Sequence, residues 1–254
     1  MRLVILTQDD PFFLGKNIDY LVKNLPPHSE VVATVLFEVS PFGKRESFKD
    51  KMLKTLNIFG CQFFIYYGLQ FVKAKLSPST SVTNVLKKHD IPVIQLEKPV
   101  NNKESLEIIR SLKPDLLISI GGNQIFKRPL LDIATHGCIN LHTALLPKYR
   151  GLMPSFWVLR FNEKYTGVSV FFVDEGIDSG EIIVQKKVEI GNRSQQELIK
   201  DTKQIGMDCI LESIEKIHSG DYILIPNPEE EKTYFSFPTK EDVKAFKAAG
   251  KRFF

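Results

Sequence analysis

Short runs of strand-forming apolar residues alternate with segments of helical spacing along most of this chain. The first run, residues 3–7, ends at the polar loop of residues 8–13, and apolar residues then recur at helical intervals over 15–25. The pattern continues with strands at 31–37, 92–96 and 115–121 and helices at 45–76, 81–89 and 105–112. Because strands that alternate with helices form parallel sheets, we predict an α/β fold with a doubly wound, mostly parallel, Rossmann-like sheet flanked by helices.

The second half of the chain extends this pattern and ends differently. It predicts strands at 138–141, 167–173 and 181–188, and helices at 154–161 and 194–219. Residues 222–226 and 232–237 then predict a small β-hairpin or a pair of extended strands, and 239–249 a closing helix. We therefore divide the chain into a main domain of residues 1–220 and a C-terminal extension of residues 221–254.

Composition excludes several protein classes. With 254 residues, of which 43% are hydrophobic, the chain can bury a core and is not disordered over most of its length. Its 34 basic and 30 acidic residues are mostly interspersed, and the net charge of +4 is an ordinary balance for a soluble protein. Lys244, Lys247, Lys251 and Arg252 place much of the positive excess near the end, a pattern more typical of a solvated helix end than of a phosphate site.

The cysteines and the apolar segments indicate the cellular location of the protein. Cys61, Cys138 and Cys209 are odd in number, far apart and without CxxC spacing, which argues against a disulfide framework and a zinc site. The most apolar window, residues 58–72, is shorter than the ~20 residues of a membrane-spanning helix. Residues 1–6 enter a strand pattern at once, without the layout of a signal peptide. We expect a cytoplasmic protein with no membrane association.

Three polar residues with catalytic potential occur where predicted strands end. Asn140 and His142 are two apart on an extended segment, so their side chains project to the same side. Asp178, in the loop after the next strand, lies beside them if these strands are neighbours, and ligands of doubly wound sheets bind at this edge. Asn140 could then donate to an oxyanion and His142 shuttle a proton or donate to the same oxygen. Asp178 could orient the imidazole and accept a proton.

Each of these residues also has an ordinary structural interpretation. A single Asn at a strand end is usually a turn residue that bonds to backbone, and a single His there is usually a satisfied, partly buried side chain. Asp-Ser-Gly, as at Asp178, is a common tight turn. The surrounding sequence favours the functional interpretation.

Two longer strings surround these residues at fixed spacing. Residues 137–151 read GCINLHTALLPKYRG, and TGVSV at 166–170 and IDSG at 177–180 follow. Over roughly residues 114–190 the chain resembles the formyltetrahydrofolate-dependent formyltransferase family, which includes methionyl-tRNA, glycinamide ribonucleotide and nucleotide-sugar enzymes. The family's Asn, His and Asp triad falls on Asn140, His142 and Asp178. The resemblance implies transfer of a formyl group from 10-formyltetrahydrofolate to a primary amine by direct attack, with no metal.

The resemblance also implies where the folate binds. It places the pterin against Gln124, Ile125 and Phe126, with Leu131 nearby, and against the backbone of the loop formed by Asp174, Glu175, Gly176, Ile177 and Asp178. A flat heteroaromatic ring needs an apolar slot with main-chain groups along its edge. For Ile125, Phe126 and Leu131, plain core packing is an equally good explanation.

Departures from each subfamily lead us to expect an amino sugar of a nucleotide-sugar as the acceptor. The loop at residues 8–13 is acidic and bulky, where glycinamide ribonucleotide enzymes carry a glycine-rich phosphate loop. Methionyl-tRNA enzymes add a C-terminal β-barrel domain for tRNA, which we do not expect in this chain, so a tRNA acceptor is disfavoured but stays open.

The resemblance to nucleotide-sugar N-formyltransferases includes a short C-terminal β element, which in that group often helps a dimer form. Tyr222, Ile223, Ile225, Tyr234 and Phe235 are expected either to form a homodimer contact or to pack on their own subunit. Formyltetrahydrofolate hydrolysis and a non-catalytic folate-binding or nucleotide-binding module stay open as alternative functions.

Overall fold

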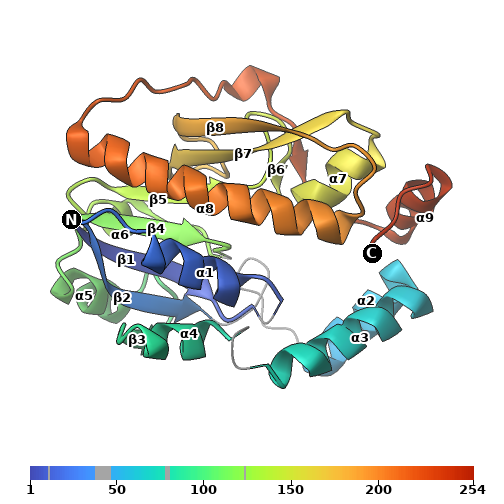
Figure 1. Cartoon of the computed structure of the whole chain (residues 1–254), viewed down its shortest axis with the longest axis horizontal. Coiled ribbons are helices and arrows are strands. Elements are labelled where there is room, and N and C mark those ends of the chain that lie inside the picture. Colours follow the sequence, from blue (N-terminus) through green and yellow to red (C-terminus); the bar gives the residue numbers. More distant parts are fainter. Residues whose placement is uncertain (11, 38–46, 78–80, 123) are drawn as a thin grey trace.

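A central sheet organises the computed structural model, which describes residues 1–10, 12–37, 47–77, 81–122 and 124–254 (Figure 1). Its strands are β1 (Arg2–Gln8), β2 (Glu30–Phe37), β3 (Val93–Gln95), β4 (Leu116–Ile120), β5 (Cys138–His142), β7 (Tyr165–Phe172) and β8 (Ile182–Glu189). Within the described residues, seven strands lie in the order β3-β2-β1-β4-β5-β7-β8. The first five are parallel, and β7 is antiparallel to both β5 and β8. The predicted α/β fold with a mostly parallel sheet is confirmed.

Helices cover both faces of the sheet. On one face lie α1 (Leu14–Lys23), α4 (Val82–Lys88) and α8 (Gln195–Ser219), whose apolar side chains form one core cluster with the strands. On the other face, α5 (Lys103–Ser111) and the short, unpredicted α6 (Arg128–Leu131) share a second cluster with β1, β2 and β4. A capping box opens α8, where the Ser194 hydroxyl and the Glu197 carboxylate each accept a bond from the other residue's backbone N–H.

The helix predicted at residues 45–76 is two helices, α2 (Phe48–Phe59) and α3 (Cys61–Lys75). Gly60 separates them at a φ of +87°, a conformation that side chains other than glycine rarely adopt. Arg45, the predicted start, lies outside the described residues. Figure 1 shows the two helices at the edge of the molecule, where α2 contacts α9 (Lys240–Ala248), the predicted closing helix.

The predicted C-terminal hairpin does not form, because each of its two extended segments pairs elsewhere. Ile225 makes an antiparallel bridge to Ile182 at the start of β8. The strand β9 (Tyr234–Phe235) pairs in parallel with β6 (Arg150–Gly151), and the 3-10 helix η3 (Glu229–Glu231) lies between the two segments. The tail therefore crosses the edge of the sheet where β5 ends.

The remaining expectations about domains and environment are only partly addressed by the fold. The described helices include none with the length and apolar character that crossing a membrane requires. A cytoplasmic location, a homodimer and the division of the chain at residue 220 stay predictions.

Candidate active site

The carboxyl end of β5 presents Asn140 and His142 to one cavity. In the sheet, Asn140 is level with Ser119 of β4 and with Phe171 of β7, so it lies between two neighbouring strands. His142 is buried, with 7% of its surface exposed, and Asn140 is half-buried. Both residues line a cavity of about 240 Å³. The Asn140 amide makes no hydrogen bond with the described residues, so it is available to a ligand.

Asp178 reaches the same cavity from the loop between β7 and β8. Its Oδ2 atom lies 3.6 Å from Nδ1 of His142 and accepts a hydrogen bond of 2.8 Å from the Gly151 N–H. The structure thus brings the three predicted residues together. Their catalytic roles stay a prediction.

The hydrogen bond on the far side of His142 determines which ring nitrogen faces the site. Nε2 lies 2.7 Å from the carbonyl oxygen of Tyr149. A carbonyl oxygen can only accept, so Nε2 carries a hydrogen, and Nδ1 is the nitrogen that faces Asp178. A second proton on the ring would lie at Nδ1, between the imidazole and the carboxylate.

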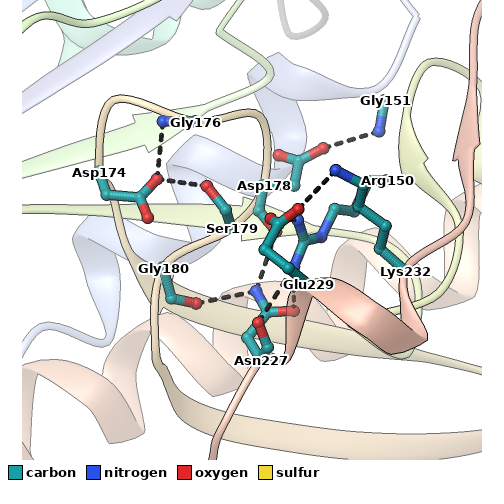
Figure 2. Close-up of polar contacts among 10 residues, drawn as sticks. All are labelled: Arg150, Gly151, Asp174, Gly176, Asp178, Ser179, Gly180, Asn227, Glu229 and Lys232. Carbon is teal, nitrogen blue, oxygen red and sulfur yellow. Dashed lines mark hydrogen bonds and ion pairs between the residues drawn. The ribbon is translucent and has the colours of Figure 1, made fainter.

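The C-terminal tail holds the Asp178 loop in place (Figure 2). Asp178 has a φ of +50°, in the left-handed region. The Asn227 amide donates to the carbonyl oxygens of Asp178 and Gly180, at 2.9 Å each. In turn, Arg150 donates to the Asn227 side-chain and backbone oxygens at 2.9 and 3.1 Å, and it pairs with Glu229. A buried cation and a buried amide therefore connect the tail to β6 and to the loop.

The predicted pterin segment lies beside this triad. Gln124, Ile125 and Phe126 all line the cavity. The Gln124 side-chain oxygen accepts from the Val100 N–H at 3.0 Å, so part of this amide serves the fold. Phe126 is buried against Phe37, whereas Ile125 is 49% exposed and available to a ligand.

The predicted loop contacts divide into two groups. Asp174, Gly176 and Ile177 line the cavity, and the Asp174 carboxylate accepts from the Gly176 N–H at 3.0 Å. Glu175 is not among the lining residues, and its carboxylate instead lies 3.4 Å from the Arg128 N–H. Leu131, at the end of α6, is not among the lining residues of this cavity: it is buried in a core cluster with Phe126 and lines a separate cavity.

Sequence reasoning missed Lys203 and Asn227. Lys203, on α8, lines the cavity that holds Asn140, His142 and Asp178. Burial lowers the pKa of its ammonium, and the nearby Asp10 carboxylate opposes this in part. A lysine in a charged helix is normally expected to face solvent. In the structure, the neighbouring residues Thr202 and Gly206 are buried, so this part of α8 faces the protein interior.

The acidic loop after β1 bonds to backbone. Asp9 accepts from the Val82 N–H at 3.0 Å, and Asp10 accepts from the amides of Phe12 and Phe13 at 2.6 and 3.2 Å. Pro11 lies outside the described residues. Across the described ranges, we find no group of three or more His, Cys, Asp or Glu side chains that could hold a metal ion.

Comparison with known proteins agrees with this geometry. The family model described as formyl transferase matches residues 67–213. The methionyl-tRNA formyltransferase of Kosmotoga olearia is 38% identical over 169 residues, which cover 66% of this chain and 54% of that enzyme. The match therefore spans about half the length of this relative.

Solved structures share the fold at lower identity. An N-formyltransferase from Helicobacter canadensis, in complex with folinic acid and dTDP-3-aminofucose, superposes with a TM-score of 0.56 and 20% identity, covering 92% of this chain and 70% of that one. A phosphoribosylglycinamide formyltransferase from Bacillus halodurans gives a TM-score of 0.60 and 23% identity, covering 86% and 96%.

Proposed function

The chain belongs to the formyl transferase family, and we propose that it transfers a formyl group from 10-formyltetrahydrofolate to a primary amine. The observation that supports this reaction is the meeting of Asn140, His142 and Asp178 in one cavity at the edge of the sheet. An amide donor, an imidazole and a carboxylate are the groups that acyl-type transfer to an amine requires.

The three side chains would divide the work. The Asn140 amide donates to the formyl oxygen, which gains negative charge as the amine nitrogen bonds to the formyl carbon. Asp178 accepts the proton that the amine loses, directly or through water. The Nε2 bond to the Tyr149 carbonyl keeps the His142 ring oriented, and a proton on Nδ1 would face the Asp178 carboxylate at 3.6 Å and add positive charge near the formyl oxygen. The bond from the formyl carbon to the donor nitrogen then breaks, and that nitrogen takes up a proton.

The cavity suits a folate donor. Ile125, Phe126 and Ile177 supply apolar surface, and main-chain groups of the loop at residues 174–178 would read a heteroaromatic edge. The Helicobacter canadensis enzyme, whose complex contains folinic acid, shares this fold.

For the acceptor, we propose methionyl-tRNA ahead of the amino sugar favoured by the sequence analysis. The 38% identity to a methionyl-tRNA formyltransferase supports the tRNA acceptor, whereas the solved sugar enzyme, at 20% identity, bears on the fold alone. Asp9 and Asp10, which could have attracted an amino sugar's ammonium, bond to backbone amides. The amino sugar stays the second candidate and glycinamide ribonucleotide the third.

One assay separates these possibilities. The protein is incubated with 10-formyltetrahydrofolate and, in turn, methionyl-tRNA, a panel of nucleotide-linked amino sugars and glycinamide ribonucleotide. We expect tetrahydrofolate release that depends on methionyl-tRNA. Release with a sugar or with glycinamide ribonucleotide alone would overturn the acceptor, formate release without any amine would indicate a hydrolase, and no release with any amine would contradict formyl transfer.

A further inference from the structure

Lys203 lines the active-site cavity, and its ammonium forms no ion pair with any described residue. It lies on α8, three positions before Gly206, and residues at this spacing share a helix face. A Cβ atom added at Gly206 would lie 2.7 Å from the side chain of Leu141, so this face of α8 packs directly on β5. Lys203 thus enters the cavity beside the end of the strand that carries Asn140 and His142.

The acidic side chains nearby accept hydrogen bonds from backbone amides and form no ion pair with Lys203. Asp10 attracts Lys203 at longer range but bonds to the backbone amides of Phe12 and Phe13. Asp174 accepts from Gly176, and Asp178 accepts from Gly151. Lys203 makes no hydrogen bond or ion pair with any described residue.

A partly buried ammonium without a counter-ion is unfavourable, because it has lost hydration and gained no partner. Inside a cavity, the same ammonium binds an incoming anion more strongly than a surface lysine does, since the surroundings screen the attraction less. The cavity therefore combines a site for transfer with one unpaired positive charge.

We propose that Lys203 forms an anion subsite, which binds a phosphate or carboxylate oxygen of a substrate while the formyl group is transferred. The inference rests on the proposed function, because it assumes that this cavity binds the two substrates. The anion has two possible sources, an acceptor phosphate or the glutamate carboxylates of the folate. The acceptor is favoured, because the carboxylate charge that acts on Lys203 is that of Asp10 in the β1–α1 loop, whereas the predicted folate contacts come from the β4–α6 and β7–β8 loops.

Binding measurements test the subsite without any turnover. Inorganic pyrophosphate, folinic acid and its analogue without glutamate are titrated by calorimetry into the wild type, Lys203→Met and Lys203→Arg. Lys200→Met is the control, because Lys200 is an exposed lysine on the same helix. We expect Lys203→Met to weaken one of the anions by about tenfold to a hundredfold, as for a lost charged hydrogen bond, and Lys203→Arg to retain most of the affinity.

The pattern of losses identifies the source of the anion. Weaker binding of pyrophosphate supports an acceptor phosphate, and weaker binding of folinic acid but not of its glutamate-free analogue supports the donor. Equal binding by Lys203→Met and the wild type for all three compounds, or no binding of any of them at millimolar concentration, overturns the subsite.

A second measurement needs no variant, in case Lys203→Met does not fold. The wild-type protein is treated with an amine-reactive reagent, and the modification of Lys203 and Lys200 is read by mass spectrometry. Pyrophosphate or folinic acid should protect Lys203 and leave Lys200 reactive, and full reactivity of Lys203 with both would contradict the proposal. Failure of formyl transfer with every amine would refute the proposed function without changing either binding result.

Discussion

At the level of single residues, one amide among the described residues of the cavity has a hydrogen-bonding capacity that the fold does not use. Asn140 projects from the end of β5 without a hydrogen bond to the described residues, whereas Gln124 and Asn227 both bond to the protein. A side chain that contributes little to the fold can be removed with little effect on stability. A change in turnover in such a variant then reports on catalysis and not on unfolding.

Asn140→Ala should lower kcat on the order of 100-fold to 1000-fold, because an oxyanion donor is lost. The midpoint of thermal unfolding should stay close to that of the wild type, since no hydrogen bond within the described protein breaks. Steady-state kinetics and circular dichroism provide the two measurements. Turnover close to the wild type in a folded variant would remove Asn140 from the proposed mechanism.

Asp178→Asn separates the charge of this residue from its structural bond. The amide oxygen can still accept from the Gly151 N–H, so the loop should keep its position. The carboxylate that would take the amine's proton is gone, and kcat should fall by about 100-fold or more. Binding of folinic acid, measured by calorimetry, should change little, and a lost folinic acid site with unchanged kcat would reverse the assignment.

Some residues of the candidate site can be predicted from the sequence, and others cannot. Asn140, His142 and Asp178 are predictable because Asn140 and His142 end a recognisable strand and Asp178 follows another, β7, which pairs with β5 although it runs antiparallel to it. Lys203 and Asn227 are not, because their roles depend on which helix face packs against β5 and on where the tail crosses, and neither is a local property. The surroundings of Leu131 depend on packing for a similar reason, since an apolar residue suits a core as well as a slot.

At the level of elements, the same distinction applies. The strands that build the parallel sheet are continuous apolar runs with little alternative, and they match their predictions. The hairpin fails because the extended segments of the tail find partners in Ile182 of β8 and in β6, at long range in sequence. The segment predicted as mainly helical, residues 45–76, is interrupted at Gly60, because the apolar pattern continues through a residue with a positive φ.

The tail's contact with the Asp178 loop can be tested at Asn227. Asn227→Leu keeps a similar volume but removes the bonds to Asp178, Gly180 and Arg150. We expect a loss of about 1–3 kcal/mol in the free energy of unfolding, because the two carbonyls are left unpaired and Arg150 loses one of its bonds. Hydrogen exchange at residues 174–180 should become faster, and kcat should fall with it. The exposed Asn192→Leu serves as the control, and unchanged exchange in the loop would contradict a restraining role.

A charge cluster joins α1 to the end of α4. Asp19 bonds to Lys23 at 2.5 Å, to His89 at 2.7 Å and to Lys88 at 3.3 Å. Hydrogen bonds from Lys23 and then His89 hold the pKa of Asp19 well below its usual range. A carboxyl with a lowered folded-state pKa stabilises fully above its unfolded value, about 3.9, and loses that contribution as the pH falls toward the folded value.

Asp19→Asn should therefore reduce stability more at pH 7 than at pH 3. The loss at pH 7 should be about 1 kcal/mol or less, because the lysine partners are largely exposed. Urea unfolding at the two pH values measures both differences. A gap between variant and wild type that stays constant or widens on acidification would show that Asp19 does not act through its charge.

At the level of the whole molecule, an aromatic cluster makes the last residues part of the core. Phe246 of α9 is fully buried and stacks on Phe156 of α7 (Pro154–Arg160) at 5.1 Å, and Phe253 stacks on Phe246 at 4.5 Å. The same cluster includes Phe59 and Phe63, from the end of α2 and the start of α3. One apolar cluster thus joins the peripheral helices, the tail and the helix that follows β6.

Removal of the tail tests whether the chain divides at residue 220, as the sequence suggested. A chain of residues 1–220 would expose Phe156 and its neighbours, and each large apolar side chain left in water costs about 1.5–3 kcal/mol. A few such side chains approach the ~5–15 kcal/mol that stabilises a typical domain, so we expect the shortened chain not to unfold cooperatively. Phe246→Ala in the full chain should lose about 3–5 kcal/mol, whereas the exposed Lys244→Ala should lose almost nothing. Cooperative melting of residues 1–220 near the wild-type temperature would instead establish that the main domain is independent and that the tail serves only the active site.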